Sequence, residues 1–198
     1  APEAGTDRLR QVINKGISEE DLLATCRNAF SLGWKLIKFY FMIGLPTETW
    51  EDVAAIIDLA GKARREAGAN AGRVQINVSV GTFVPKPHTP FQWERQLSLA
   101  EARERISRLK GLLPRRGFNL KWQDPQQSVL EGVFSRGDRS LARLIESAWR
   151  AGVRLDGWSE HYRLEAWQDA ARECGIDLEA FLQGGNPGKP LPWDHLAS

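Results

Sequence analysis

The chain has only two cysteines among its 198 residues, Cys26 and Cys174, and they lie far apart in the sequence. Neither belongs to a spacing that binds a metal ion. Cys26 falls on an apolar helical stripe with Leu22 and Phe30, where a free cysteine behaves as a small apolar side chain. We therefore interpret both cysteines as structural and expect no metal site built from this chain. Two isolated cysteines are also typical of a reducing cytoplasm, which we predict as the location.

Long apolar runs and a large net charge are also absent. No stretch approaches the roughly 20 apolar residues of a transmembrane helix, and no signal-peptide pattern is present. Lys and Arg number 27 against 25 Asp and Glu, a net charge of +2, so nothing global argues for a nucleic-acid or membrane partner. The sequence has no glycine-rich phosphate loop and no Ser-His-Asp spacing, the signatures of common nucleotide-binding and hydrolase sites.

The segment Lys35–Glu48, KLIKFYFMIGLPTE, is the most informative one that is present. Its apolar, aromatic-rich part, Leu36–Ile43, predicts a buried strand that Gly44 and Pro46 end. In parallel sheets, ligands bind beyond the carboxyl ends of the strands. We therefore predict a binding loop over residues 42–48.

Helices are predicted on both sides of this strand. Apolar spacing predicts one over residues 6–15, closed by Gly16 in a left-handed conformation. Two capping-box signals begin the next helices: Ser18 with Asp21, and Thr49 with Asp52. A strand, a helix and a second strand in this order predict a right-handed crossover and an α/β fold.

The second predicted strand alternates between apolar and polar side chains. Its polar members are Gln75, Asn77 and Ser79. Interior parallel strands are usually apolar throughout, and burying three unpaired polar groups would cost roughly 1–3 kcal/mol each. The polar row must face water, as on an exposed edge, or a lumen that holds a polar ligand. These three residues are our candidates for a substrate lumen.

A proline-rich loop follows, residues 83–93, FVPKPHTPFQW. Its three prolines remove backbone donors and fix their own φ angles, so it cannot continue a sheet. One interpretation is a stiff lip in which Lys86 and His88 meet substrate. The other is an ordinary capping loop with buried aromatic side chains.

The composition changes near residues 117–125. Most of the eight tryptophans lie within or after this stretch: Trp122, Trp149, Trp158, Trp167 and Trp193. Helical spacing predicts short helices over residues 126–134, 139–151, 161–174 and 178–182. We therefore predict a domain boundary after residue 122, with residues 123–198 as a separate, mostly helical extension.

Three segments resemble the radical S-adenosylmethionine (SAM) superfamily, particularly its branch with an N-terminal cobalamin-binding domain. FMIGLPTET followed by WED is similar to the family's fifth-strand signature. The opening APEAGTDRLRQVINKG is similar to its fourth-strand Glu-x-Gly-(Ser/Thr) segment, and VQINVSVGTFVPKPHTPFQW to its sixth strand and the loop after it. The segment RGDRSLARLIESAWRAGVRLDGWSEHYRLEAW resembles the helical tail of an uncharacterised subgroup.

The resemblance covers nearly the whole chain but only the second half of the family's domain. It implies that residues 1–122 form the C-terminal half of a partial parallel (β/α) TIM-like barrel, followed by the helical extension 123–198. The family's [4Fe-4S] cluster needs three cysteine thiolates, usually CxxxCxxC, which this chain lacks. The chain also starts on Ala1 and has Met42 as its only methionine. We therefore expect a fragment cut inside the barrel, whose missing N-terminal half is its partner.

The resemblance also implies site residues at matching positions. Glu3 is expected to approach the ribose of SAM and Lys15 its carboxylate, although Lys15 also suits a plain helix C-terminal cation. The fifth strand is expected to hold adenine through backbone groups and apolar contacts at Met42, Ile43 and Gly44. Glu48 is the glutamate of the family's turn, or a carboxylate that stabilises a helix start.

The implied function is reductive cleavage of SAM with a [4Fe-4S] cluster, giving a 5'-deoxyadenosyl radical that acts on an unknown substrate. With cobalamin as a further cofactor, the outcome would be methylation. The substrate is RNA, protein or a small molecule, and no catalytic residue is assigned. Alone, the chain is expected to be inactive. The alternative is a non-catalytic α/β scaffold whose helical tail binds a protein or RNA partner.

Overall fold

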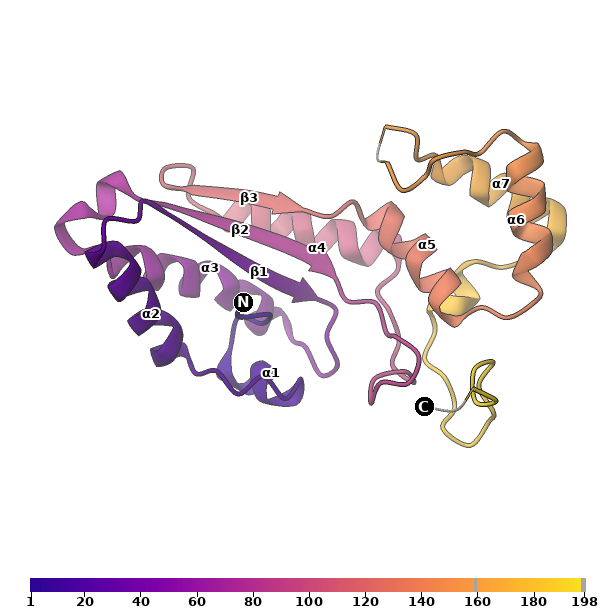
Figure 1. Ribbon diagram of the computed structural model, residues 1–198, viewed down its shortest axis with the longest axis horizontal. Coiled ribbons are helices and arrows are strands. Elements are labelled where there is room, and N and C mark those ends of the chain that lie inside the picture. Colours follow the sequence, from indigo (N-terminus) through magenta and orange to yellow (C-terminus); the bar gives the residue numbers. More distant parts are fainter. Residues whose placement is uncertain (159, 197–198) are drawn as a thin grey trace. The chain divides into compact units, whose positions relative to one another are not determined.

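The computed structural model describes residues 1–158 and 160–196, which form two compact units (Figure 1). The first unit comprises Ala1–Phe83 and Ala100–Gln123, and the second comprises Val84–Leu99 and Asp124–Ser198. That residues 1–122 and 123–198 are separate domains remains a prediction. No described helix has the length and apolar character needed to cross a membrane.

The first unit contains a parallel sheet of three strands in the order β1 (Leu36–Ile43), β2 (Gln75–Thr82) and β3 (Phe118–Trp122). The predicted α/β class with parallel strands is confirmed. β1 begins and ends at the predicted residues because its apolar run stops at Gly44, where φ is 86°. β3 is a strand that the sequence analysis did not predict. The sheet is open, so a barrel remains a prediction.

Five helical segments complete this unit: α1 (Asp7–Val12), α2 (Glu19–Ser31), α3 (Trp50–Arg65), the 3-10 helix η1 (Gly68–Arg73) and α4 (Leu99–Leu112). Both predicted capping boxes are present at the starts of α2 and α3. The predicted left-handed closure at Gly16 is wrong. Asn14 adopts that conformation instead, with φ of 54°, because an asparagine side chain tolerates the left-handed region.

The helices of this unit cover one face of the sheet (Figure 1). Phe39 and Phe41 of β1 lie beside Val78 and Val80 of β2 in the strand register, and all four are buried. The apolar stripe of α3 is buried as well: Val53, Ile56, Leu59, Ala60 and Ala63. Fully burying one such large apolar side chain stabilises a fold by roughly 1.5–3 kcal/mol, so this layer fixes the unit.

The second unit is mostly helical, with α5 (Pro125–Arg136), α6 (Leu141–Arg150), α7 (Leu164–Cys174) and the 3-10 helix η2 (Glu179–Leu182). Its core includes Val133, Leu144 and Ala148, each 0% exposed, packed with Trp167. The proline-rich segment belongs to this unit. The Nζ of Lys86 donates to Glu131 of α5 at 2.6 Å, which attaches that segment to the helices.

Gly5 marks the closest approach between the N-terminal segment and α3. A Cβ atom on Gly5 would lie 2.4 Å from the carbonyl oxygen of Asp52 and 2.7 Å from the nitrogen of Ile56. Both are backbone atoms of a helix, so neither can move alone. Glycine is therefore required at this position for α3 to pack against the segment that carries Glu3.

We expect Gly5→Ala to lower the free energy of unfolding by about 1–3 kcal/mol, because the added methyl group displaces α3. Gly16→Ala is the matched control, since no atom lies within 4 Å of a Cβ there and its φ is not positive. The control should change stability by less than about 1 kcal/mol. Urea unfolding of the two variants measures both values, and equal midpoints would contradict the packing argument.

Candidate functional site

The candidate site lies at the carboxyl end of β1. Glu3 forms an isolated parallel bridge with Phe41 of this strand. The backbone N–H of Glu3 donates to the carbonyl of Tyr40 at 3.0 Å, and the N–H of Met42 donates to the carbonyl of Glu3 at 2.8 Å. These bonds place Glu3 beside the end of β1, next to the loop that the sequence analysis predicts as a binding loop.

Two of the predicted site residues, Glu3 and Lys15, form an ion pair in the structure. Their side-chain atoms Oε1 and Nζ are 3.6 Å apart, and the side chains are 27% and 34% exposed. An ion pair this exposed contributes about 0–1 kcal/mol to stability. A ligand that offers hydroxyls to the carboxylate and an anion to the ammonium can therefore replace the pair at little cost.

The loop after β1 is held by the buried carboxylate of Glu48. Its Oε1 accepts a hydrogen bond from the N–H of Gly44 at 2.8 Å and forms an ion pair with Arg105 of α4. The Glu48 side chain is only 2% exposed. Burial lowers the pKa of Arg105, and the nearby charge of Arg108 lowers it further, but an arginine remains charged at neutral pH. Glu48 thus positions the loop and has no carboxylate edge open to solvent.

A second clamp holds the same loop from the side of α1 and α3. The carboxylate of Asp52 accepts hydrogen bonds from Thr6 Oγ1 at 2.6 Å and from the N–H of Thr49 at 2.9 Å, and it forms an ion pair with Arg8. Arg8 also donates to the Thr47 hydroxyl at 3.1 Å and to its carbonyl at 3.0 Å. Thr47 has φ of 61°, a strained value for a β-branched residue that these bonds stabilise.

The hydrogen bonds that Asp52 accepts also change its pKa. Burial raises the pKa, but hydrogen bonds from Thr6, the Thr49 backbone and Arg8 outweigh burial and lower it to about 2. The residue is 4% exposed, so solvent does little to weaken these bonds. Asp52 therefore stays ionised across the physiological range and stabilises the loop as an anion.

The residues predicted to hold adenine have few free backbone groups here. Ile43 is 0% exposed, and its carbonyl accepts from the N–H of Phe83 at 2.8 Å. Gly44 and Met42 donate their N–H groups to Glu48 and Glu3, as described above. The half-buried side chain of Met42 remains open to an apolar contact. Their role in binding adenine stays a prediction.

The predicted polar row of β2 lies on the sheet face opposite the buried layer. Gln75 is exposed, Asn77 and Ser79 are half-buried, and Gln75 Nε2 donates to Asn77 Oδ1 at 3.1 Å. β2 is the central strand, so an exposed sheet edge does not explain this row. The register adds polar neighbours: Lys38 and Asn119 beside Asn77, and Tyr40 and Lys121 beside Ser79. Whether this face lines a lumen stays a prediction.

Lys86 and His88 belong to the second unit. The ammonium of Lys86 contacts Glu131, as noted, and the Ser135 hydroxyl at 3.1 Å. His88 has φ of 58°, and its backbone N–H donates to Gln92 Oε1 at 3.1 Å. The structure thus shows Lys86 paired with α5 and His88 in a tight turn. Their predicted contacts with substrate remain untested.

The sequence analysis did not identify several residues that lie at or near the candidate site. Arg105 is one of them: it precedes the buried Ile106 in α4, and its side chain is 26% exposed. Lys121 was missed because β3 is too short and too polar to read as a strand. Thr82 was missed as well, and its hydroxyl is buried without a hydrogen-bond partner among the described residues. It lies beside Ile43 in the register, at the same end of the sheet.

Both cysteines are free and lie in different units. Burial and the nearby charge of Glu66 raise the pKa of the Cys26 thiol to about 11, so it stays protonated. Cys174 ends α7 in the second unit. Within residues 1–158 and 160–196, no three His, Cys, Asp or Glu side chains gather closely enough to hold a metal ion.

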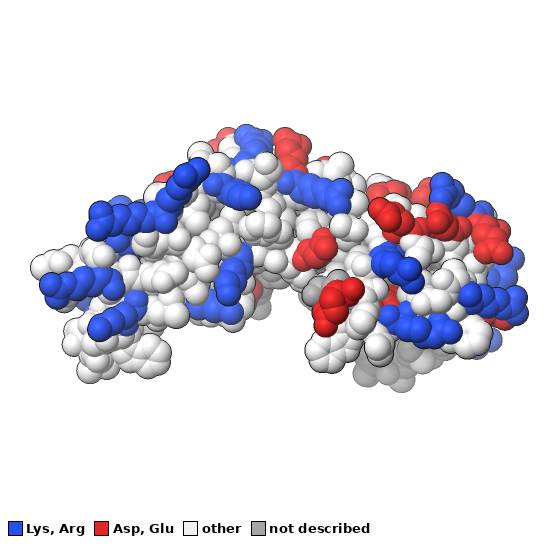
Figure 2. Space-filling model, turned by 90° about the horizontal axis from the view of Figure 1, so that it is seen from above, with Lys and Arg blue, Asp and Glu red and all other residues white. Residues whose placement is uncertain are grey.

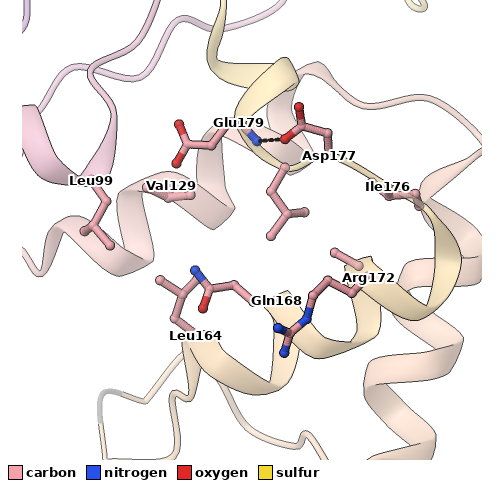
Figure 3. Close-up of a pocket in the computed structure, with 10 residues that line it drawn as sticks. Leu99, Val129, Leu164, Gln168, Arg172, Ile176, Asp177 and Glu179 are labelled. Atoms are coloured by element: carbon pink, nitrogen blue, oxygen red, sulfur yellow. Dashed lines mark hydrogen bonds between the residues drawn. The ribbon is translucent and has the colours of Figure 1, made fainter.

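The second unit has a cavity of its own, of about 410 Å³ (Figure 3). Apolar residues that line it include Val129, Leu164 and Leu178, and Gln168 and Arg172 of α7 line it as well. On the opposite side, the N–H of Glu179 donates to Asp177 Oδ1 at 3.0 Å. None of the predicted site residues lines this cavity.

Comparison with known proteins gives a family match over part of the chain. Residues 1–60 match the radical SAM superfamily, a stretch that contains Glu3, Lys15 and the loop after β1. The chain is 32% identical over 146 residues to an uncharacterised protein of Methanocaldococcus jannaschii. That alignment covers 74% of this chain but 31% of the archaeal protein, so the chain spans less than a third of this relative's length. No solved structure matches the chain significantly.

We expect Asp52→Asn to lower the free energy of unfolding at pH 7 by about 2 kcal/mol, because the shift from an unfolded pKa near 4 is lost. The contribution of a carboxylate with a lowered pKa is present above about pH 4 and disappears as the pH falls to about 2. Wild type and variant should therefore converge in urea unfolding between these pH values. Asp58→Asn, at an exposed position of the same helix, should change stability by less than about 0.5 kcal/mol. A constant difference from pH 7 to pH 2 would contradict the assignment.

Proposed function

We propose that this chain is part of a radical SAM enzyme and supplies the portion of the SAM site around the carboxyl end of β1. The observation that carries the proposal is the Glu3–Lys15 pair, 3.6 Å apart, inside the stretch that matches the superfamily. A weak, partly exposed ion pair beside a strand end is suited to exchange its partner for a ligand of matching charge.

The chemistry of these residues fits SAM. A carboxylate accepts hydrogen bonds from two adjacent hydroxyls, so Glu3 would hold the ribose, at roughly 1.5–3 kcal/mol for each charged hydrogen bond. The Lys15 ammonium would pair with the ligand carboxylate. Gly44 allows the adenine to approach the backbone closely, since no Cβ projects there. The buried Thr82 hydroxyl supplies a further polar group that lacks a partner in the described chain.

The two clamps described above would keep this site in shape. Glu48 and Arg105 fix the loop to α4, and Asp52 fixes it to α1 and α3. In the proposed enzyme, the first unit is part of a partial (β/α) barrel, and the polar face with Gln75, Asn77 and Ser79 lines its lumen. Sites held by buried hydrogen-bonded groups lose little freedom when a ligand binds.

The described residues do not fit a [4Fe-4S] cluster, because they include no set of three thiolates. We therefore propose that the cluster ligands lie outside this chain, and we assign no step through the cluster to the residues described. Bound cluster would supply the electron for reductive cleavage of SAM. No residue of this chain is assigned to cobalamin.

Glu3→Gln in the intact protein should raise the dissociation constant for SAM about tenfold, the loss of roughly 1.4 kcal/mol. The amide keeps the shape of the side chain but weakens the bonds to the ribose hydroxyls. Isothermal titration calorimetry measures the constant. Glu20→Gln, on the exposed face of α2, is the control that should leave it unchanged. Equal affinities for Glu3→Gln and wild type would sink the assignment.

A second candidate function is favoured by the exposed apolar residues of the helical extension. Ile145 and Trp149 lie one turn apart on α6 at 48% and 58% exposed, and Leu155 and Trp158 follow at 64% and 63%. Exposed patches of this kind mark surfaces that bind other proteins. This supports a scaffold whose tail binds a protein partner.

Fluorescence anisotropy measures the affinity of the chain for a single-stranded RNA, and this affinity distinguishes a protein partner from an RNA partner. If the tail binds protein, we expect no measurable affinity for RNA between 50 and 200 mM salt. If the tail contacts several phosphates of an RNA, raising the salt over this range should weaken binding by orders of magnitude. Steeply salt-dependent binding would instead favour RNA as the partner.

A further inference from the structure

A separate cavity of about 410 Å³ lies at the opposite end of the sheet, where β1 and β2 begin. It is built entirely within the first unit, from Phe30, Gly33, Trp34, Lys35, Asn70, Arg73 and Val74. Its volume is within the roughly 300–1,000 Å³ of small-molecule sites. The strand β1 separates it from the proposed SAM site by about 23 Å.

Two aromatic residues line this cavity, the buried Phe30 and the exposed Trp34. Trp34 is 65% exposed, and its neighbours Leu32 and Leu36 are 79% and 48% exposed. Three large apolar side chains are thus exposed within five residues of the chain, and clusters of exposed apolar side chains mark binding surfaces. The turn at Gly33, with φ of 87°, places Trp34 there, and the Trp34 N–H donates to Ala29 at 3.2 Å.

The charge of the cavity has one sign. Lys35 and Arg73 line it together with the amide of Asn70, and no acidic residue does. Neither cation forms an ion pair within the described parts of the chain. On the face that Figure 2 shows, several basic side chains lie at this end of the first unit. The α2 C-terminus carries a partial negative charge, so it stabilises a nearby cation without a counter-ion.

We infer that this cavity binds a planar ring that carries a phosphate, a ligand of the size of a nucleoside monophosphate. An exposed tryptophan stacks on a base, and such stacking is sequence-tolerant and strong. Arg73 and Lys35 pair with the phosphate, for which arginine offers a bidentate fork. The Asn70 amide can both donate to and accept from a ring edge. The site goes beyond the proposed function and does not depend on it.

The test is isothermal titration calorimetry of the chain with AMP, adenosine and inorganic phosphate. AMP should bind at least tenfold more tightly than either of its halves. Trp34→Ala and Arg73→Met should each weaken AMP binding about tenfold or more. Both residues lie at or near the surface, so their replacement should leave thermal unfolding unchanged. Arg116→Met is the matched control, an exposed arginine of the same unit outside the cavity, and should retain AMP affinity.

Three results would overturn the inference: no AMP binding, equal affinity for AMP and phosphate, or AMP binding that the cavity variants do not affect. Binding of single-stranded RNA without AMP would also overturn it, in favour of a macromolecular surface. Saturating SAM and the Glu3→Gln substitution should leave AMP affinity unchanged. A failure of the SAM assignment is therefore distinguishable from a failure of this one.

Discussion

The packing of α3 on the buried face of β1 and β2 is the constraint on which the rest of the first unit depends. It needs a glycine at position 5, because the helix backbone approaches within 3 Å of where a Cβ would lie. Asp52, near the start of α3, lies where the N-terminal segment, the loop after β1 and the start of this helix meet. One helix thus aligns the strand that bears the site with the segment that bears Glu3.

This arrangement separates residues that hold the fold from residues that are free to bind. Glu48 and Asp52 are buried carboxylates with several partners, and removing either would leave unpaired groups inside the protein. Glu3 and Lys15 are partly exposed and meet at 3.6 Å, a contact that contributes little to stability. In the proposed enzyme, the strong interactions shape the loop and the weak pair gives way to the ligand.

The two ends of the sheet differ in whether their charged side chains are paired. At the carboxyl end, charges of both signs are paired and the loop backbone is largely satisfied by its own chain. At the amino end, Lys35 and Arg73 stand beside an exposed tryptophan without a counter-charge in the cavity. A cavity lined by cations and an aromatic ring suits an anion with a flat apolar part, and the ion pair proposed for the SAM site suits a ligand with both charges.

The sequence by itself determined the local elements of this protein. The run from Leu36 to Ile43 is long and apolar enough to be a strand, and the capping boxes at Ser18 and Thr49 begin helices, because these signals act between near neighbours. It also placed Glu3 and the binding loop in segments that prove adjacent. The tertiary structure alone decided that Arg105 pairs with Glu48, that Phe118–Trp122 joins the sheet and that Trp34 opens a cavity with Arg73. Those contacts join residues some 40 to 60 positions apart, and only the packing of helices on one sheet face brings them together.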